Sequence, residues 1–426
     1  MVRVASVVFS HYPGDPRPRR EAEALVEAGM SVDILCLRGD GERREEVVNG
    51  VRVFRLPAMQ TRSGKIRYLW EYGWFVLLAF LRLSRLHLFE AYQVVHIHNM
   101  PDVLVFCALL PRLGGAKIIL DLHDPMPEVY MAKYSVSASH SAIRLLRLLE
   151  KWSVSFAHIV LTPNSGFRDL FLSRGCPAQK MHIVMNSPQE KIFHGETEEL
   201  RRKGWGNSDK FVIMYHGLIS ERNGLDTALE AIAQVQREIP DLAFWVYGGG
   251  DGVKHFLERR EDLNLADVVE YYGYVSQEKI ASLIPSIHVG IVPNKVNPFT
   301  NLNMPTRIFE YLSMGKPVIV PRTRGILDYF DEDSVHFFEA GNPRSLAERI
   351  VDVSRNSVQS REKLSRGMEV YRAYRWELQG KHFVEVVGSL AGMDLPAEAS
   401  AQAGGWRCTE YESGHEQSED SPSCQN

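Results

Sequence analysis

Residues 303–320 read NMPTRIFEYLSMGKPVIV, and this stretch decides the fold of the second half of the chain. Pro305 favours the first turn of a helix, where its missing N–H costs nothing, and Gly315 favours the left-handed residue that closes one. A helix that ends at Gly315 and runs directly into the apolar segment 317–320 is typical of a repeating strand and helix unit. We therefore expect a parallel sheet around it.

The first turn of this helix is also a candidate binding site. The amides of Thr306, Arg307 and Ile308 are expected to point outward at the positive end of the helix dipole, beside the Arg307 guanidinium. Such a helix terminus binds phosphate. Glu310, one turn further on, is placed to accept two hydroxyl hydrogen bonds of the kind that a ribose offers. A plain amphipathic helix with a solvated Glu310 is the alternative for this stretch taken alone.

Apolar, β-branched runs alternate with helical patterns along the rest of the chain, which predicts doubly wound α/β sheets. The runs lie at 2–9, 32–37, 51–56, 94–98, 117–122, 158–162 and 182–185, and then at 211–215, 243–247, 268–272, 288–292, 317–320 and 335–338. The polar, glycine-containing connection 188–209 between the two sets predicts a hinge. Ligands of such sheets bind at the carboxyl ends of the strands, so we expect the site in a cleft between two facing domains.

The predicted organisation has four parts. Residues 1–187 form a Rossmann-like domain, 188–375 form a second one, and a helix at 376–390 returns to the first domain. Residues 391–426 are rich in Ser, Glu, Gly and Gln and predict a disordered acidic tail.

Composition excludes several classes of protein. With 426 residues, 45% hydrophobic content and a net charge of −4, the chain fills two cores and is too balanced for nucleic-acid binding. Its five cysteines are scattered and lack C-x-x-C spacing, which indicates neither disulfides nor zinc and favours a reducing compartment. The start of the chain lacks a signal peptide's apolar region, and the longest uncharged apolar run, 72–81, is half of the roughly 20 residues a spanning helix needs. We expect a cytoplasmic protein without a transmembrane helix.

Two glycine-containing segments with arginines follow predicted strands. In the stretch 10–29 the prolines predict a loop until Pro18 opens a helix, which places Gly14, Arg17 and Arg19 on a loop at the strand's carboxyl end. A basic loop held by Asp15 is the alternative. In the stretch 215–232, Gly217 allows close backbone approach to a ligand, Arg222 offers a fork for a diphosphate, and Gly224 precedes a helix.

Histidines and carboxylates end two neighbouring predicted strands. These are His96, His98 and Asn99 after one strand, and Asp121, His123, Asp124 and Glu128 after the next. Imidazoles beside carboxylates suggest proton transfer or metal ligation. We expect no metal, because no third ligand completes a His-x-His or Glu-x-x-His set in the sequence. His123 is the preferred site histidine. For His98 or Asn99, the alternative is a structural role as the cap of the following helix.

Taken together, residues 2–390 resemble a retaining family 4 glycosyltransferase of the GT-B fold, of the kind found in bacterial exopolysaccharide and lipopolysaccharide biosynthesis. The resemblance rests on the order of the segments 15–29, 96–102, 121–128, 184–188, 215–232 and 305–317. It implies a UDP- or GDP-sugar donor, a diphosphate held by Arg222, and catalytic roles for His123 and Arg222. It further implies a donor contact from Gly14 in the first domain. The donor contacts that it implies in the second domain come from Gly217, Tyr274, Val275, Asn303, Met304, Pro305, Thr306, Arg307 and Glu310.

Two positions depart from the family's pattern. Leu302 stands eight positions before Glu310, where the family commonly has a second glutamate, and Asn223 stands where a lysine is common. Arg222 then substitutes for the lysine, and Asn301 or Asn303 is expected to meet the sugar. Two cations and helix-terminal amides stabilise a departing diphosphate without a metal. With no carboxylate placed as a nucleophile, retention is expected from attack on the face that the diphosphate leaves.

The resulting interpretation is transfer of a sugar to a glycan or lipid-linked acceptor in surface polysaccharide synthesis. The alternatives are a nucleotide-sugar epimerase or hydrolase of similar fold, and a binding module without transfer activity.

One further segment bears on the partner. The segment 62–90 is apolar and aromatic, with Trp70, Trp74, Phe75, Phe80 and Leu81 flanked by Arg62, Lys65, Arg67, Arg82 and Arg85. It predicts either a buried crossover helix or contact with the anionic inner face of a membrane.

Overall fold

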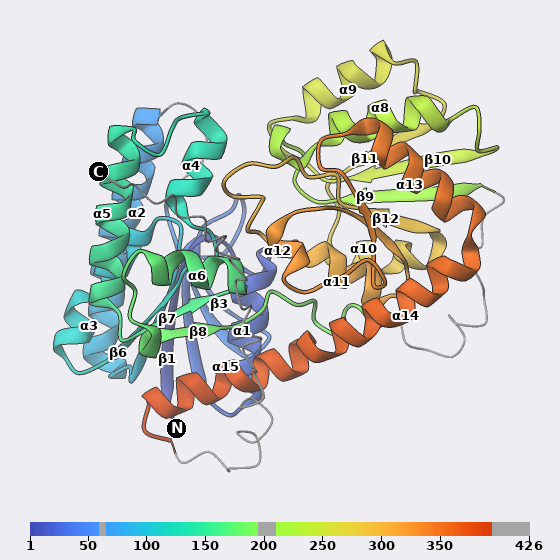
Figure 1. The fold of residues 1–426 in the computed structure, drawn as a ribbon. Coiled ribbons are helices and arrows are strands. Elements are labelled where there is room, and N and C mark those ends of the chain that lie inside the picture. The colour runs from blue at the N-terminus through green and yellow to red at the C-terminus, as the bar shows by residue number, and fades with distance from the viewer. Residues whose placement is uncertain (59–64, 195–209, 394–426) are drawn as a thin grey trace, which may run out of the picture.

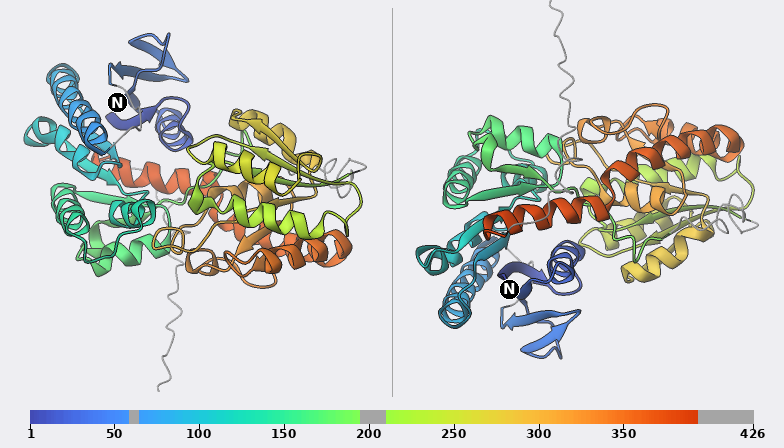
Figure 2. Two further views of the ribbon diagram at one scale, coloured as in Figure 1. Left: turned by 90° about the horizontal axis from the view of Figure 1, so that it is seen from above. Right: turned by 90° about the horizontal axis from the view of Figure 1, so that it is seen from below.

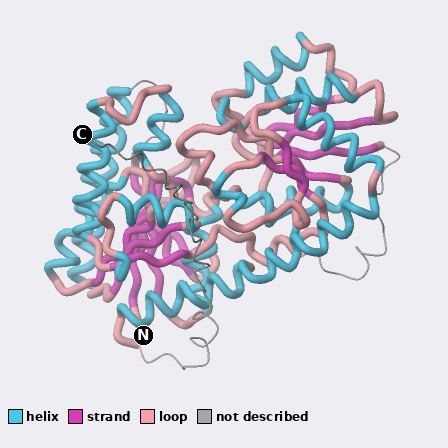
Figure 3. The backbone as a smooth tube through the Cα atoms, in the orientation of Figure 1, coloured by secondary structure: helices cyan, strands magenta, loops and turns pink. Residues whose placement is uncertain are grey.

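The computed structural model describes residues 1–58, 65–194 and 210–393, which form two α/β domains lying side by side (Figure 1). The strands gather into two separate sheets, each with helices around it (Figure 3). The predicted fold class is confirmed, because both sheets are built mainly from parallel strands in doubly wound order.

The first sheet has eight strands in the order β3-β4-β2-β1-β5-β6-β7-β8. In chain order they are β1 (Arg3–His11), β2 (Ser31–Leu37), β3 (Glu45–Val48), β4 (Val51–Leu56), β5 (Val94–His98), β6 (Lys117–Asp121), β7 (Ile159–Thr162) and β8 (Met181–Ile183). All neighbours pair in parallel except β3 and β4, which form an antiparallel hairpin at the edge. The sequence analysis missed β3, because its residues Glu45–Val48 alternate between exposed and half-buried and lack a continuous apolar run.

The second sheet has six strands, all parallel, in the order β11-β10-β9-β12-β13-β14. They are β9 (Phe211–His216), β10 (Leu242–Tyr247), β11 (Val269–Gly273), β12 (Val289–Ile291), β13 (Val318–Pro321) and β14 (His336–Phe338). Each was predicted to within one residue at either end, because fully buried parallel strands are nearly continuous apolar runs.

Helices cover both faces of the first sheet. They are α1 (Pro16–Glu27), α2 (Lys65–Glu90), η1 (Asp102–Ala108), α3 (Leu109–Leu113), α4 (Met126–Tyr134), α5 (Ser141–Phe156), α6 (Ser165–Ser173) and η2 (Ala178–Lys180). One core holds residues of α2, η1, α5 and α6, and a second core on the opposite face holds residues of α1 and of the last helix, α15 (Trp376–Leu390). Both cores include the inward-facing side chains of the strands.

The second domain adds η3 (Glu221–Asn223), α8 (Leu225–Val235), α9 (Val253–Asp262), α10 (Gln277–Leu283), η4 (Ile284–Ser286), α11 (Thr306–Ser313), α12 (Arg324–Leu327), α13 (Pro343–Arg355) and α14 (Ser357–Tyr374). Figures 1 and 2 show α14 and α15 running in succession from this domain back across the first. Trp376, Phe383 and Val387 of α15 are buried in the first domain's core. The final segment of the described chain therefore belongs structurally to the first domain.

Three sequence predictions about segment ends have different outcomes. Helix α1 begins at Pro16 and not at Pro18, because Asp15 caps it and Pro16 is well tolerated in a first turn. Gly315 has the predicted left-handed φ of 70° after α11. The predicted tail, apart from residues 391–393, and most of the predicted hinge lie outside the described residues.

Helix α2 differs from the expectation that no helix could span a membrane. Its part Trp70–Glu90 is long and apolar enough to span a membrane, by length and composition alone. Only 28% of its most apolar window is buried inside the protein. The core helix of a soluble protein can have the same length and composition. One side of α2 does pack on the sheet, where Phe75, Ala79 and Leu83 are fully buried.

Candidate active site

Each sheet has one point at which the strand order reverses. In the first sheet this point lies between β1 and β5, and in the second between β9 and β12. Loops that leave the carboxyl ends of strands on either side of such a point separate in opposite directions, which makes it the usual place for a ligand. The side chains predicted from the sequence fall into two groups, one near each of these points.

The loop after β9 in the second domain is shaped by glycines. Gly217 has a φ of 129°, and a Cβ at this position would lie 2.8 Å from Nη2 of Arg307. Gly224 has a φ of 69°, and a Cβ there would lie 1.9 Å from the carbonyl oxygen of Pro293. The backbone after β9 therefore packs directly against the segment after β12, and the approach of Gly217 to a ligand stays a prediction.

Glu310 is part of a buried hydrogen-bond chain that the sequence analysis did not foresee. Its Oε2 atom lies 2.5 Å from Nε2 of His216, and Nδ1 of His216 lies 2.9 Å from the hydroxyl of Tyr311. That hydroxyl donates to the carbonyl oxygen of Met214 at 2.9 Å. Because the single Tyr311 proton is used there, Nδ1 of His216 is the donor to Tyr311, and a second proton lies between Nε2 and Glu310.

This chain changes the expected role of Glu310. The side chain is only 7% exposed, and one of its two oxygens is engaged by His216. Its other oxygen, Oε1, has no recorded partner within the described residues. His216 is therefore a site residue that the sequence analysis missed. It ends β9 just before Gly217, and the position at the end of a strand is the feature by which His123 was chosen.

The first turn of α11 has two available amides and not three. The Ile308 N–H donates to the carbonyl oxygen of Pro305 at 3.1 Å, which corrects the prediction for that residue. No partner is recorded for the amides of Thr306 and Arg307 among the residues that the structure describes. The Arg307 guanidinium lies over the Tyr215 ring, 4.7 Å from its centroid, and its buried Nη1 has no hydrogen-bond partner in the described chain. Met304 and Pro305 are buried beneath this turn.

Arg222 lies in η3, directly after the loop that follows β9. Its guanidinium carbon is 4.8 Å from the centroid of the Phe299 ring, and the side chain is half-buried. No ion pair is recorded for Arg222 in the ranges that the structure covers. An Arg held against an aromatic ring without a carboxylate partner retains its hydrogen-bond donors for an anionic ligand.

The structure separates the two asparagines that were expected to meet the sugar. The Asn301 side chain accepts a hydrogen bond from the Arg324 N–H at 3.3 Å, so it helps to hold the start of α12. Asn303 is half-buried and has no recorded side-chain partner in the described part of the chain. Leu302 packs against the core of the first domain. The residue that departs from the family's pattern is therefore used as an interdomain contact.

Tyr274 and Val275 follow the carboxyl end of β11, before α10. Tyr274 is 76% exposed, whereas Val275 packs against the core of the second domain. Their location at the end of a strand agrees with the one predicted, and no contact joins them to Arg222 or Glu310 in the described residues.

In the first domain, Gly14 and Asp15 follow β1, but Arg17 and Arg19 belong to the first turn of α1 and not to a loop. The Arg17 guanidinium lies 3.3 Å from Asp15. Burial alone would raise the pKa of Asp15, yet the charge and hydrogen bonds of Arg17 hold it well below its usual range. Asp15 therefore holds the Arg17 guanidinium, as the alternative of a basic loop held by Asp15 predicts. Arg19 pairs with Glu278 across the domain boundary at 2.9 Å.

His123 lies beside Asp121 at the end of β6, and both are buried. Nδ1 of His123 is 3.9 Å from Asp121, which is too long for a hydrogen bond, and it has no other partner in the described chain. Asn99 does not act as a helix cap. It links the loops after β5 and β6 by donating to Asp102 at 2.9 Å and to the carbonyl oxygen of Asp124 at 2.6 Å.

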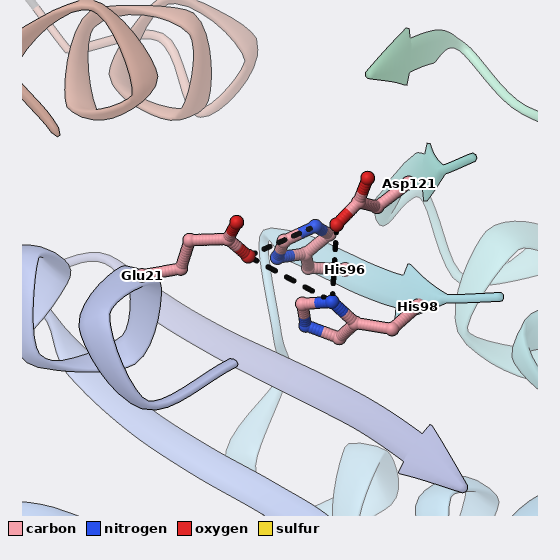
Figure 4. Close-up of side chains that lie close together, drawn as sticks. All are labelled: Glu21, His96, His98 and Asp121. Atoms are coloured by element: carbon pink, nitrogen blue, oxygen red, sulfur yellow. Dashed lines mark hydrogen bonds and ion pairs between the residues drawn. The ribbon is translucent and has the colours of Figure 1, made fainter. Parts of the chain in front are cut away.

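We expected no metal because no third ligand completes a His-x-His or Glu-x-x-His set in the sequence, and the structure contradicts that reason. Glu21 of α1 and Asp121 of β6 complete a set with His96 and His98, and one ligand atom from each lies within 4.8 Å of the others (Figure 4). The sequence does not reveal this set, because Glu21 is 75 positions before His96 and reaches it only through the packing of α1 on the sheet.

The fold thus brings the predicted residues together as two groups. Glu310, Arg307 and Gly217 lie close to one another in the second domain, and His123 and Asp121 lie together in the first. The hydrogen bonds and ion pairs between the domains include Arg19 with Glu278, Ser165 with Tyr329 and Asp328, Asp169 with Arg324, and Glu23 with Gln189 and Lys191, and none of those in the described residues joins the two groups.

Two doubly wound α/β domains, each with a switch point at the carboxyl ends of its strands, are the arrangement of the GT-B fold. The family comparison is more specific. Residues 15–187 match the model of the glycosyl transferase 4-like domain, and residues 196–369 match that of the glycosyl transferases group 1. Together these matches cover most of the chain, which therefore belongs to the group 1 glycosyl transferases with a glycosyl transferase 4-like first domain. The suspected family resemblance is confirmed.

Individual relatives are distant. A lipopolysaccharide core biosynthesis glycosyltransferase, LpsE of Rhizobium meliloti, is 25% identical over 118 residues, which are 28% of this chain and 32% of that protein. The chain spans about half or less of the length of the curated relatives it matches first.

Solved structures resemble the chain over nearly its whole length. Sucrose-phosphate synthase from Thermosynechococcus elongatus has a TM-score of 0.74 at 20% identity, covering 92% of this chain and all of that one. Anabaena HepE in complex with UDP-glucose has a TM-score of 0.67 at 14% identity, covering 91% of this chain and all of that one. At these identities the structural likeness establishes the fold.

Proposed function

We propose that this protein is a retaining glycosyltransferase that moves a sugar from a nucleoside-diphosphate sugar to a glycan or lipid-linked acceptor in surface polysaccharide synthesis. The observation that carries the proposal is the group at the β9–β12 switch point. There the glycine-lined loop after β9, the Arg307 guanidinium and the first turn of α11 lie close to the buried Glu310 carboxylate, and Arg222 follows the same loop in η3. The family match supports transfer, the HepE complex supports a UDP-sugar donor, and LpsE supports a surface glycan as product.

The donor diphosphate is assigned to Arg222 and to the first turn of α11, with Arg307 as the second cation. Two cations and the amides of Thr306 and Arg307 match the charge that develops on a departing diphosphate. Glu310 accepts a ribose hydroxyl through Oε1 while His216 fixes its other oxygen. Gly217 lets the backbone approach the phosphates, Asn303 meets the sugar, and the backbone at Tyr274 and Val275 meets the base.

The first domain supplies the acceptor side. His123 lies beside the transferred sugar in this proposal, and Gly14 lines the loop after β1. No carboxylate is placed as a nucleophile, so the acceptor attacks the face that the diphosphate leaves and the departing oxygen takes its proton. No divalent metal is required at the donor site, because the arginines and helix amides supply the positive charge.

The proposed membrane contact rests on helices α2 and α5. Both contribute to the same core on one face of the first sheet, and both expose apolar side chains on their outer sides. On α2 these are Trp70, Trp74, Leu77, Leu81, Leu88 and Phe89, and on α5 they are Leu145, Leu148 and Trp152. Between them, α3 exposes Leu109, Leu110 and Leu113. Phe75, which the sequence analysis counted with this surface, is fully buried against Phe9.

Charge makes an anionic bilayer the fitting partner for this surface. Arg144, Arg147 and Lys151 are exposed on α5 beside its leucines and tryptophan, and Arg67 is exposed on α2. Each cation near an anionic membrane contributes about 1 kcal/mol of binding. Arg67 and Arg82 contribute less, because they pair with Glu71 and Glu45, and Arg82 also lies over Phe54. Arg62 and the side chain of Lys65 lie outside the described part of the chain.

Liposome sedimentation tests this contact. Changing Arg144, Arg147 and Lys151 together to Glu should abolish salt-sensitive binding to vesicles that contain anionic lipid. The matched control changes Lys254, Arg344 and Arg361, which are exposed on the second domain and on α14, and should bind like the parent. Equal binding by both variants, or binding that ignores lipid charge, contradicts the proposal.

A panel of nucleotide sugars tests the transfer itself. Purified protein with a donor and a lipid-linked glycan acceptor should release nucleoside diphosphate only when both are present. An epimerised donor without acceptor indicates an epimerase, release that needs only water indicates a hydrolase, and binding without turnover indicates a binding module. Each of these three outcomes rejects the proposed reaction.

A further inference from the structure

Four buried side chains converge beneath the loop that carries His123. Glu21 comes from α1, His96 and His98 from β5, and Asp121 from the end of β6. They are between 1% and 6% exposed, and Figure 4 shows their polar ends pointing toward one another. None of them belongs to the proposed donor site in the second domain.

One ligand atom from each side chain lies within 4.8 Å of the others, and three of the six separations are close to the edges of a small coordination tetrahedron. Oε2 of Glu21 lies 3.9 Å from Nε2 of His96 and 3.7 Å from Nδ1 of His98, and Nδ1 of His98 lies 3.2 Å from Oδ2 of Asp121. A tetrahedral Zn²⁺ with bonds of about 2.0 to 2.1 Å separates its ligands by roughly 3.3 to 3.5 Å. Shifts of a few tenths of an ångström would bring these three separations into that range.

Two atoms of the set lack any partner. Nε2 of His96 and Oε2 of Glu21 are buried and make no hydrogen bond within the described residues. Buried polar atoms in native proteins are nearly always satisfied. Both of these atoms face the same small space, so a single group placed there would satisfy both.

His98 is held in the manner of a metal ligand. Its Nε2 lies 3.1 Å from the hydroxyl of Ser6 on β1 while its Nδ1 faces the other three side chains. A ligating histidine usually donates its second ring N–H to an oxygen, which fixes the tautomer with a lone pair toward the metal. In the metal-free alternative, the proton is on Nδ1 and is donated to Asp121, and the Ser6 hydroxyl donates to Nε2.

The surrounding charges leave room for a cation. Arg17 is paired with Asp15, and Arg20 points to Asn186 and to the carbonyl oxygen of Ser187. The carboxylates of Glu21 and Asp121 thus lie close together in a buried place without a paired arginine. Two carboxylates buried this close to each other lose their hydration and repel, which is costly unless a cation is present. A divalent cation would offset this cost, because it is attracted to both carboxylates.

We propose that Glu21, His96, His98 and Asp121 form a four-coordinate site for a divalent transition-metal cation, with Zn²⁺ as the best match. Two imidazoles and two carboxylates suit such an ion, and four protein ligands leave no open position, so the site is structural. It fastens α1 to β5 and β6 and so fixes the loop that carries His123. It is separate from the donor site, for which no metal is proposed.

Metal binding by the full-length chain, produced without a histidine tag, tests the proposal. Chelator-treated protein is dialysed against ZnCl₂, and bound zinc is measured by elemental analysis. The parent should bind one equivalent, and Glu21→Gln and His96→Gln should bind at least about tenfold more weakly, since even outer-shell changes cost that much. His140→Gln, which changes an exposed histidine of the same domain, is the matched control and should bind like the parent.

Cobalt substitution provides a second measurement that needs no variant. Co²⁺ bound to the parent chain should give the intense visible absorption of four-coordinate cobalt, and zinc should displace it. No stoichiometric zinc or cobalt binding by the parent, or a weak six-coordinate spectrum, overturns the site in favour of the proton-linked network. Unchanged zinc binding by folded Glu21→Gln, with circular dichroism as the check of folding, also overturns it.

Discussion

Replacing Arg222 by Ala should weaken nucleotide binding without unfolding the protein. The guanidinium is half-buried against Phe299, and no carboxylate is recorded with it in the described chain, so its removal leaves no buried charge unpaired. The cost in the free protein is that of one cation–π contact, about 0.5 to 1 kcal/mol. In the complex, loss of a charge-assisted hydrogen bond to the diphosphate costs about 1.5 to 3 kcal/mol. This corresponds to a dissociation constant raised about 10- to 150-fold.

Calorimetric titration with UDP and with GDP measures this effect, and thermal unfolding monitors the fold. Arg222→Lys keeps the charge but loses the planar fork, so its affinity should fall between those of the parent and the Ala variant. Arg355→Ala removes an exposed arginine that pairs with Glu238 at 2.6 Å, and it should leave affinity unchanged. The reasoning is refuted if the Ala variant binds its preferred nucleotide as the parent does, or if it binds more weakly only because it has unfolded.

Four other predictions follow from the structure. Glu310→Ala removes the group that accepts the ribose hydroxyl and leaves Nε2 of His216 unpaired. Calorimetry should therefore show weaker nucleotide binding by Glu310→Ala than by Glu310→Gln, whose amide can still form a hydrogen bond with His216. Equal affinities of the two variants would argue against the assignment of Glu310 to the ribose. Transfer should proceed equally with and without added magnesium or manganese, and full dependence of the rate on either ion would contradict the metal-free donor site. Truncation after Leu390 should leave activity intact, and a soluble but inactive product would contradict the predicted tail. Burial, and then the charge of Lys316, lower the pKa of His288 to about 4, so the contribution of His288 to stability is full above pH 6.5 and is lost as the pH falls toward 4. In denaturant unfolding, the free energy of unfolding of His288→Asn should therefore change with pH by about 1 to 2 kcal/mol less than that of the parent, after allowance for solvent screening. An identical pH dependence in the two proteins would reject this prediction.

The sequence predicted most of the fold because its main signals are local. Apolar runs such as Val94–His98 define buried parallel strands whatever surrounds them, and Pro305 and Gly315 define the ends of α11 through backbone geometry alone. The edge strand Glu45–Val48 carries no such run, and it forms because the backbone of β4 is available for pairing. The start of α1 was misplaced because several prolines compete for the first turn, and the cap at Asp15 decides among them.

The candidate site was predictable only in part. Residues at the ends of strands, such as His123 and Gly217, can be found from the sequence because the topology places strand ends at one edge. Contacts that depend on packing cannot. His216 meets Glu310 across 94 positions, and Glu21 meets His96 only after α1 has docked on the sheet. The interdomain use of Leu302 likewise requires both domains to be placed.

The most direct test of the central claim is the balance between donor consumed and product formed. With a donor labelled in its sugar, an anionic membrane and a lipid-linked acceptor, the account predicts one sugar incorporated for each nucleoside diphosphate released. The sugar should keep the anomeric configuration of the donor, and His123→Ala and Arg222→Ala should both lower incorporation. Release of nucleoside diphosphate without incorporation of sugar, under conditions in which acceptor is present and bound, would contradict the account.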